Sequence, residues 1–485
     1  MSDLHVLAVA SEVYPMLKTG GLADVVAALP AALEREGIAT RTLVPGYPSV
    51  VGSLRENEVA HTFASMHGGP ARLLASRTSG LELLVLDAPH LYARPGNPYL
   101  DPDGNEWPDN ALRFAALAAA AAAIGRGIIP TFRPDIVHAH DWQAALAPAY
   151  LHYGGSPRPR TVMTVHNLAF QGLYPAALLV QLGLPAHAYT LDGVEYHGSI
   201  GFLKAGLALA DRITTVSPTY AAEIQTPEHG MGLDGLLRHR SGVLTGIRNG
   251  IDTVVWNPAT DPHLRSRFDA RHRTRRGINK QALRHRMSLD MDETAPLFGV
   301  VSRLAWQKGL DLLLGIADRL VAAGAQLALI GSGERELESG FIAAGERHPG
   351  RIGVAIGYDE GLAHLAQAGA NAILIPSRFE PCGLTQLCAM RYGALPIVAR
   401  VGGLADTVID INDVNRGAEF GTGMQFTPVT GDALTAAIER AMALWRDPAA
   451  WRRVQAHAMA ADVSWREPAA QYAALYRALA AERMP

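Results

Sequence analysis

Short apolar runs typical of β-strands alternate with amphipathic helical windows along the first half of the chain. Strands linked through helices in this order indicate a parallel sheet covered on both faces, because each parallel connection must cross over the sheet. We expect helices over residues 22–36, 107–125, 142–152 and 200–209. We expect strands at HVLAVA (5–10), TRTLVP (40–45), LELLVLDA (81–88), PDIVHAHD (134–141), RTVMTVHN (160–167) and ADRITTVS (210–217).

The second half of the chain repeats this alternation, so the sequence predicts two domains. A chain of 485 residues is longer than one hydrophobic core usually supports. We expect an α/β fold with two Rossmann-like, doubly wound parallel-sheet domains. The expected boundaries are 1–245, 246–458 and a C-terminal helix over 459–485 that returns to the first domain. The expected strands of the second domain are LFGVVSR (297–303), QLALIGSG (326–333), IGVAIGY (352–358), NAILIPS (371–377) and LPIVAR (395–400).

Composition restricts the partners and the compartment. The formal net charge of −3 gives no general attraction to nucleic acid or to an anionic membrane, and the alanine-rich run 115–124 is too short to span a bilayer. Cys382 and Cys388 are the only cysteines, and no secretion signal is evident, so we expect a cytoplasmic protein. The arginine-rich stretch 265–276 is expected to be a solvated surface.

Gly-Gly-Leu-Ala-Asp occurs twice, in KTGGLADVV (18–26) and in RVGGLADTV (400–408). Each copy follows an expected strand and leads into an expected helix, where free backbone N–H groups can bind an anion. Asp24 and Asp406 fit the early positions of these helices. A loop and helix cap used twice would explain the repeat by itself. A cation just before the first copy favours a binding site instead. The candidates in this first loop are Lys18, Gly20 and Gly21.

Polar side chains end two expected strands of the first domain. HAHDWQ carries His138, His140 and Asp141, and TVHNLAFQG carries His166 and Asn167. Ligands in open α/β sheets bind beyond the carboxyl ends of the strands, so we interpret these clusters as part of a site. A zinc site is the alternative. The sequence lacks an H-E-x-x-H helix and cysteine pairs, so we consider a metal site the weaker interpretation.

In the second domain, Arg303 and Lys308 lie in an expected loop between a strand and a helix. Cations at such a strand exit favour a diphosphate clamp over a solvated loop. IGSGERELE supplies Gly331 and Gly333, but Glu336 replaces the third glycine of the dinucleotide fingerprint, which weakens a dinucleotide interpretation.

PSRFEPCGLTQL (376–387) places a carboxylate before the entrance of another expected helix. The N–H groups of residues 383–385 could bind phosphate while Glu380 faces a polyol. A structural alternative is that Glu380 caps the helix.

Taken in order, these motifs resemble the bacterial glycogen and starch synthases, which elongate α-1,4-glucan from ADP-glucose. The resemblance covers nearly the whole chain and implies the GT-B architecture, in which two Rossmann-like domains face a deep cleft. The motifs are KTGGLADV, APHLY with RPGNPY, HAHDWQ, TVHNLAFQG, FLKAGL, VSPTYA, VVSRL with QKGLDL, PSRFEPCGLTQL, GGLADTV and the late VSW.

The resemblance also implies a role for each matching residue. The residues expected in catalysis are Lys18, His166, Arg303, Lys308 and Glu380, with the three cations on the diphosphate. The residues expected to bind the donor are Gly20, Gly21, Asp141, Asn167, Asn249, Gly331, Tyr358, Cys382, Gly383, Leu384 and Thr385. Among these, Tyr358 is expected to stack on adenine, and Cys382 to contact the glucose. Glu12 and Tyr99 are expected on the acceptor side.

One departure bears on mechanism. Related retaining enzymes often carry a second glutamate eight positions after the first, where this chain has Cys388. We therefore expect a front-face reaction, in which the departing diphosphate takes the proton of the incoming hydroxyl. No metal and no cofactor are expected. The partners are ADP-glucose and glycogen or another α-1,4-glucan. A glucan phosphorylase, a UDP-glucose-dependent transferase and, more remotely, a nicotinamide dehydrogenase are the alternatives.

Overall fold

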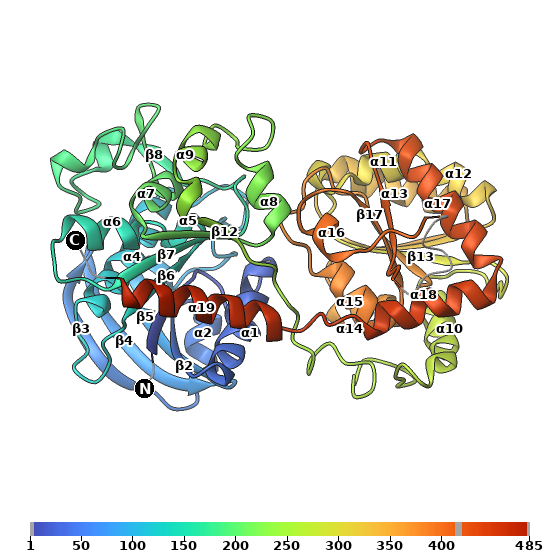
Figure 1. The fold of residues 1–485 in the computed structure, drawn as a ribbon, viewed down its shortest axis with the longest axis horizontal. Coiled ribbons are helices and arrows are strands. Elements are labelled where there is room, and N and C mark those ends of the chain that lie inside the picture. The colour runs from blue at the N-terminus through green and yellow to red at the C-terminus, as the bar shows by residue number, and fades with distance from the viewer. Residues whose placement is uncertain (1–3, 413–419, 483–485) are drawn as a thin grey trace. The chain divides into compact units, whose positions relative to one another are not determined.

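The computed structural model describes residues 4–412 and 420–482, and the chain divides into two compact units (Figure 1). The first unit contains the chain up to Asn249 and again from Trp465 onward, and the second runs from Gly250 to Ser464. The chain thus passes from the first unit to the second between Asn249 and Gly250, near the expected boundary at 245. The chain returns to the first unit after Ser464, later than the expected boundary at 458, because helix α18 continues to Ala460 within the second unit.

A nine-stranded sheet forms the centre of the first unit, in the order β12-β11-β7-β6-β1-β2-β5-β4-β3. The strands from β12 to β5 pair in parallel, as expected. A second, three-stranded sheet has the order β8-β10-β9. The bounds are β1 Leu4–Val9, β2 Ile38–Pro45, β3 Glu58–Met66, β4 Gly69–Thr78, β5 Leu81–Asp87, β6 Ile136–His140, β7 Arg160–Val165, β8 Leu173–Pro175, β9 Glu195–Tyr196, β10 Ser199–Gly201, β11 Arg212–Thr215 and β12 Leu244–Gly246.

The expectation of a purely parallel sheet is wrong at one edge. β4 pairs antiparallel with β5, and β3 pairs antiparallel with β4. The β3–β4 turn contains His67 and Gly68, which have φ angles of 45° and 100°. Positive φ at both central residues is typical of the tight turns that join twisted antiparallel strands. Neither strand is a continuous apolar run: β3 is largely exposed, and exposed positions interrupt β4, so neither matches the pattern of a buried parallel strand.

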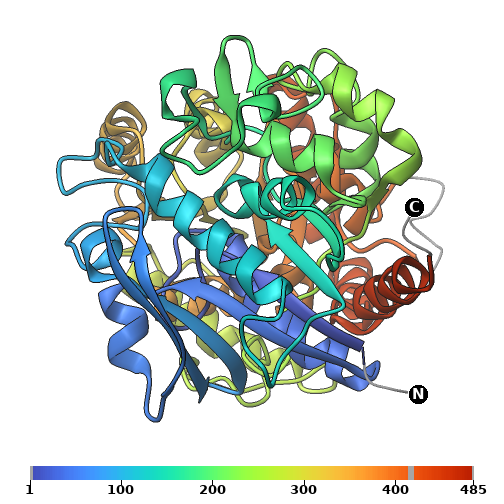
Figure 2. The ribbon, with the colours of Figure 1, turned by 90° about the vertical axis from the view of Figure 1, so that its left-hand side faces the viewer.

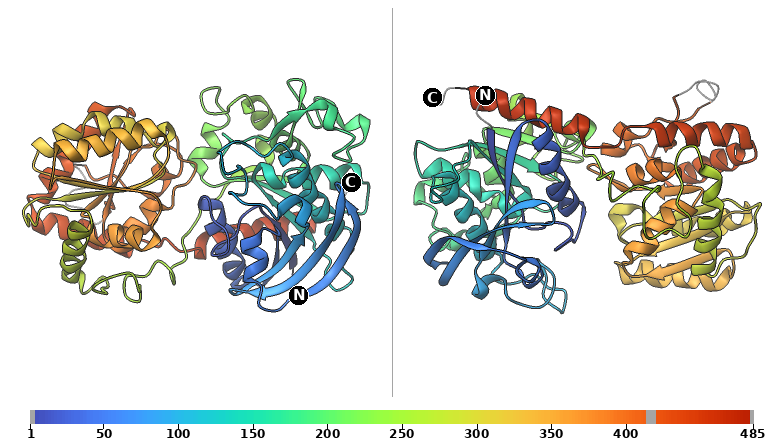
Figure 3. Two further views of the ribbon diagram at one scale, coloured as in Figure 1. Left: turned by 180° about the vertical axis from the view of Figure 1, so that it is seen from behind. Right: turned by 90° about the horizontal axis from the view of Figure 1, so that it is seen from below.

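Helices cover both faces of the large sheet. On one face, α1 and α19 pack against β1, β6 and β7 through apolar residues of one core cluster (Figures 1 and 3). The C-terminal helix therefore belongs to the first unit. The other face is covered by a layer that includes α4 and α6 (Figure 2). The helix bounds are α1 Gly21–Arg35, α2 Pro48–Ser53, α3 Pro89–Tyr92, α4 Asn110–Gly125, α5 Asp141–Ala144, α6 Leu146–Tyr153, α7 Phe202–Leu209, α8 Pro218–Glu223, α9 Asp234–His239 and α19 Arg466–Ala481.

One helical expectation changed in detail. The window 142–152 is divided into α5 and α6, because Pro148 has no N–H to donate to Ala144 in a continuous helix. The alanine-rich run lies in α4, whose small side chains are mostly buried. Among the described residues, no helix is both long enough and apolar enough to cross a membrane.

The second unit is built on a six-stranded parallel sheet in the order β15-β14-β13-β16-β17-β18. α10, α14, α15 and α18 lie on one face, and α11, α12, α13 and α17 on the other (Figures 1 and 3). The strands are β13 Leu297–Val301, β14 Gln326–Gly331, β15 Ile352–Ile356, β16 Ala372–Ile375, β17 Leu395–Ala399 and β18 Met424–Phe426. The helices are α10 Arg276–Arg286, α11 Leu310–Gly315, α12 Ala317–Ala322, α13 Arg335–Arg347, α14 Glu360–Gly369, α15 Thr385–Tyr392, α16 Gly402–Thr407, α17 Gly431–Trp445 and α18 Pro448–Ala460.

The arginine-rich stretch is not wholly a solvated surface. Arg276, its last arginine, is buried at the start of α10 and donates to the carbonyl oxygens of Gln367 and Ala370. Burial lowers the pKa of Arg276 to about 9. Arg265, Arg267 and most of the other arginines remain exposed, so the expectation holds for them and is wrong for Arg276.

Candidate active site

The first glycine loop is held by Glu12, a buried carboxylate that follows β1. It accepts hydrogen bonds from Thr19 N at 2.6 Å, Thr19 Oγ1 at 2.5 Å and Gly20 N at 3.3 Å. The Tyr99 hydroxyl donates to the same carboxylate and lies 2.8 Å from Ser11 Oγ. The structure therefore joins Glu12 and Tyr99, the two residues expected on the acceptor side, to the glycine loop.

Lys18, the first residue of this loop, forms an ion pair. Its Nζ donates to Asp24 Oδ1 at 2.9 Å, and Asp24 lies in the first turn of α1 as expected. Gly20 and Gly21 are exposed, and a Cβ added to Gly20 would meet no atom within 4 Å. The first loop thus presents open backbone, and an anion there would have to share or replace the Asp24 partner of Lys18.

Three histidines form a compact group at the carboxyl ends of β6 and β7. His138 lies within the core, with Nδ1 2.6 Å from the Tyr476 hydroxyl and Nε2 2.5 Å from Thr164 Oγ1. His140 Nδ1 lies 2.9 Å from His166 Nε2. Burial lowers the pKa of His138 and of His166 to about 3 and holds the pKa of His140 well below its usual range. All three imidazoles are therefore neutral near pH 7.

Asp141 connects the two expected clusters. Its Oδ1 accepts from the backbone N–H of His166 at 2.6 Å and of Asn167 at 3.4 Å. Burial raises the pKa of Asp141 to about 7, although these two N–H donors act in the opposite direction. Its φ of 57° lies in the left-handed region, which is uncommon outside glycine and is found at functional sites. The Asn167 side chain caps its own loop, because its Oδ1 accepts from Ala169 N.

In the second unit, Lys308 and Glu380 form one ion pair. Lys308 Nζ donates to Glu380 Oε2 at 2.6 Å, and Ser377 Oγ donates to the same oxygen at 2.9 Å. The lysine follows β13 and the other two residues follow β16, so neighbouring strands bring them together. The capping alternative is not supported, since the bonds of Glu380 run to Lys308 and Ser377 and not to the start of α15.

Arg303 also follows β13 but is exposed, and the structure records no ion pair for it with residues 4–412 or 420–482. The loop between Arg303 and α11 is held by Arg378, which the sequence analysis missed. Arg378 binds both carboxylate oxygens of Asp311 at 2.6 Å and donates to Trp306 O at 2.7 Å. Arg378 lies in the motif PSRFEPCG, and this position was the sequence signal that could have identified it.

The second Gly-Gly-Leu-Ala-Asp copy differs from the first. Gly402 has a φ of 42°, and a Cβ added to Gly403 would lie 2.4 Å from Cys382 Cα. Gly403 N donates to Glu380 O at 3.1 Å, so this loop packs directly on the segment that carries Glu380. The expectation that Asp406 lies early in a helix is wrong: α16 begins at Gly402, and Asp406 is its fifth residue.

The other expected donor residues lie at loops of both units. In the first unit Asn249 is buried, and its Oδ1 has no hydrogen-bond partner among the described residues. In the second, Tyr358 is 68% exposed beyond β15, whereas Cys382 is buried. Gly331 lets its loop pack against β13, because a Cβ there would lie 1.8 Å from Ser302 O. The residues at the start of α15 are half-buried: Gly383, Leu384 and Thr385.

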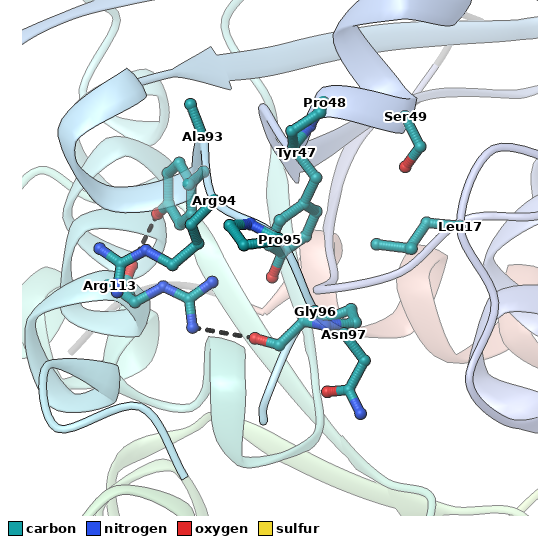
Figure 4. A pocket seen from close by; sticks show the side chains of 12 residues that line it. Leu17, Tyr47, Pro48, Ser49, Ala93, Arg94, Pro95, Gly96, Asn97 and Arg113 are labelled. Carbon is teal, nitrogen blue, oxygen red and sulfur yellow. Dashed lines mark hydrogen bonds between the residues drawn. The ribbon is translucent and has the colours of Figure 1, made fainter. Parts of the chain in front are cut away.

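A separate cavity of about 450 Å³ in the first unit was not anticipated (Figure 4). It is lined by Leu17, next to Lys18, and by residues of the 92–98 segment. Arg113 in its wall is buried and donates to the carbonyl oxygens of Leu91 and Pro98. The Tyr47 hydroxyl, also in the wall, has no hydrogen-bond partner among the described residues. The lining contains none of the residues expected to be catalytic.

The described residues contain no group of three or more histidine, cysteine, aspartate or glutamate side chains arranged to hold a metal ion. The histidine group itself is occupied by hydrogen bonds to Tyr476, Thr164 and between His140 and His166. His138 and His140 are buried, so His166 is the member of this group that is partly exposed.

Comparisons with known proteins agree with this arrangement of motifs. A family model described as the starch synthase catalytic domain matches residues 5–239, and one described as glycosyl transferases group 1 matches residues 283–455. The glycogen synthase of Rhodopseudomonas palustris (strain BisB18) is 61% identical over 483 residues, covering 100% of this chain and 99% of the relative. The glycogen synthase of Methylocella silvestris is also 61% identical, over 100% of both chains.

A solved structure extends the likeness to three dimensions. The catalytic domain of starch synthase IV from Arabidopsis thaliana, bound to ADP and acarbose, has a TM-score of 0.88 and 33% sequence identity. The match covers 99% of this chain and 100% of that one. The resemblance drawn from the motifs and the two-domain α/β fold it implied are both confirmed, and this chain belongs to the glycogen and starch synthase family of glycosyltransferases.

Proposed function

We propose that the protein transfers glucose from ADP-glucose to the non-reducing end of an α-1,4-glucan, with retention of the α-configuration, and so elongates glycogen. The observation that supports this most is the 61% identity to a glycogen synthase along the whole chain. The 33% identical starch synthase IV structure contains ADP and acarbose, which fits a nucleotide donor and a carbohydrate acceptor.

The Lys308–Glu380 pair supplies the chemistry expected of the donor side. A lysine held by one carboxylate within a partly buried loop can transfer its hydrogen bonds to an incoming diphosphate. Glu380 is then released to accept hydrogen bonds from glucose hydroxyls and to stabilise positive charge at the anomeric carbon. Arg303, which is exposed, adds a second cation for the leaving group.

The first unit supplies polar groups for the glucose. His166 and Asp141 are joined by the hydrogen bond from His166 N, so the sugar would meet a preorganised surface. No residue takes the role of nucleophile in this proposal. The leaving diphosphate oxygen accepts the proton of the attacking 4-hydroxyl on the same face, as the C1–O bond breaks and the new glycosidic bond forms.

We further propose that the reaction needs neither a metal ion nor an organic cofactor, because lysine and arginine neutralise the diphosphate. A cytoplasmic location fits the two cysteines, Cys382 and Cys388, which are buried and not joined by a disulfide. A UDP-glucose-dependent transferase or a glucan phosphorylase is the alternative within the same fold.

One assay separates these functions. Purified protein is mixed with glycogen and either ADP-glucose, UDP-glucose or glucose 1-phosphate, in the presence of a chelator. We expect ADP release and chain growth with ADP-glucose, and much slower turnover with the other two donors. Phosphate release from glucose 1-phosphate as the fastest reaction would replace the proposal with a phosphorylase. Loss of activity in chelator that magnesium restores would refute metal independence.

A further inference from the structure

We propose that His140 is a positioning residue that fixes the tautomer and ring orientation of His166. The inference rests on the proposed function in assigning His166 to the glucose, but the state of His166 can be measured without any turnover. Neither residue acts alone in the structure, since each is the recorded side-chain partner of the other.

The contact is imposed by the sheet. His140 is the last residue of β6, and His166 follows β7, the neighbouring parallel strand. The carboxyl ends of parallel strands meet at one edge, so both imidazoles extend from the same edge. Their rings lie 5.2 Å apart between centroids with an angle of 40°, and Nδ1 of His140 is 2.9 Å from Nε2 of His166.

A hydrogen bond between two neutral imidazoles requires one proton on one of the two facing nitrogens. If His140 donates, His166 Nε2 accepts and the Nδ1 of His166 must carry a proton. If His140 accepts, the Nδ1 of His166 is an acceptor. The structure records no partner for this Nδ1 within residues 4–412 and 420–482. His140 therefore decides whether His166 offers a donor or an acceptor to a ligand.

His140 is itself held rigidly on its other side. The His138 ring packs on it with a centroid distance of 4.1 Å and an angle of 36°. His138 is in turn fixed by Thr164 Oγ1 and by the hydroxyl of Tyr476, which comes from α19. The C-terminal helix thus supports His166 indirectly, through the two adjacent imidazoles of His138 and His140.

A purely structural role would not need this chemistry. His140 is 1% exposed, and a buried polar ring lowers stability unless it is hydrogen-bonded. An apolar side chain of similar volume would fill the same space without that cost. The partner it has instead is a half-buried histidine that the family resemblance places at the donor glucose.

The test compares three substitutions: His140→Asn, His140→Gln and His140→Leu. Asparagine places an amide at the position of Nδ1, where the amide can donate or accept a hydrogen bond. Glutamine places its amide one bond further from the backbone, and leucine has no polar side-chain atom. Nitrogen-15 spectra of labelled histidine, recorded on the full chain without donor or glucan, report the tautomer of His166. Steady-state kcat and KM for ADP-glucose are measured on the same preparations.

We expect one His166 tautomer in the parent and in His140→Asn, and a mixture in His140→Leu and His140→Gln. His140→Leu should lower kcat/KM by about tenfold or more, and His140→Asn by clearly less, as for other supporting hydrogen bonds to a functional histidine. In a His166→Ala background, the same two substitutions should change kcat/KM by less than about twofold. His140→Leu is expected to leave ADP affinity unchanged.

An unaltered His166 tautomer in His140→Leu overturns the proposal. Equal losses of kcat/KM with and without the His166 imidazole would also overturn it, because they indicate a structural defect. If His140→Leu fails to fold, the asparagine and glutamine variants decide: identical spectra and kinetics in both would refute a role for the Nδ1 contact. Failure of glucose transfer in the parent would instead refute the proposed function, and the spectra would still test the His140–His166 contact.

Discussion

Lys308 Nζ donates to Glu380 Oε2 across 2.6 Å, and this ion pair joins two residues that are 72 positions apart in the chain. The pair is partly buried, with 20% of the lysine and 10% of the glutamate side chain exposed. Its two members cannot be treated as independent, because the charge of each determines the hydrogen bonding of the other.

Glu380→Gln is expected to lower kcat by about a hundredfold, since the amide keeps the shape but loses the charge that stabilises the transition state. The cost should be non-additive: in a Lys308→Ala background, Glu380→Gln should have a smaller effect on kcat. Turnover and ADP binding by calorimetry are measured on the four proteins of this cycle. Strict additivity would show that the ion pair has no bearing on catalysis.

Arg303→Ala should lower kcat by about a hundredfold or more while leaving the melting temperature close to that of the parent. The guanidinium is exposed and has no ion pair with a described residue, so folding does not depend on it. Arg446→Ala, at another exposed arginine, is the matched control and should leave kcat unchanged. Near-normal turnover of Arg303→Ala would remove this residue from the leaving-group site.

The two glycine loops should respond differently to the same substitution. Gly403→Ala is expected to lower the free energy of unfolding by about 1–3 kcal/mol, because the new Cβ would lie 2.4 Å from the backbone of Cys382. Gly20→Ala meets no atom within 4 Å and should change it by less than about 0.5 kcal/mol. Denaturant unfolding measures both. Equal destabilisation would contradict the difference in packing.

Stability should fall as the pH drops below about 6.5. Burial lowers the pKa of His138 and His166 to about 3, so below 6.5 the unfolded chain binds protons that the folded chain does not. Each such histidine contributes a slope of about 1.4 kcal/mol per pH unit once its unfolded form is protonated. Asp141, whose pKa is raised to about 7, has the opposite slope between about pH 4 and 7 and offsets one histidine.

Unfolding free energies at pH 7, 6 and 5 measure this dependence. His138→Gln should reduce the slope of unfolding free energy against pH by the contribution of one histidine, about 1.4 kcal/mol per pH unit, whatever its effect on stability at pH 7. A variant with the same slope as the parent would show that His138 is not held neutral by the fold.

Much of the fold could be predicted because the signals are local. The strands β13 and β17 begin where the apolar runs begin, and the helix expected from residue 22 begins one residue earlier, at Gly21. The antiparallel strands β3 and β4 were missed because β3, at the edge, is largely exposed and neither strand is a continuous apolar run. The burial of Arg276 was also missed, since a charge run gives no sign of which side chain will find buried carbonyl oxygens.

For the site, the sequence identified residues but not their partners. His140 was noticed in HAHDWQ, and Glu380 in PSRFEPCG, from their places after strands. That Glu12 binds Thr19 and Tyr99 follows only from the folded backbone. The cavity beside Tyr47 had no sequence signal, because its wall combines a loop, a helix and a buried arginine.

The sequence by itself determined the order of the longer parallel strands and placed polar residues at strand ends, because hydrophobic periodicity and glycine turns act over a few neighbouring residues. Tertiary structure decided which groups meet. His138 reaches Tyr476 across 338 positions, and Lys308 reaches Glu380 across 72. Such contacts form only when sheet packing removes both partners from water, and that loss of solvent lowers the histidine pKa values and leaves the buried groups to bind one another.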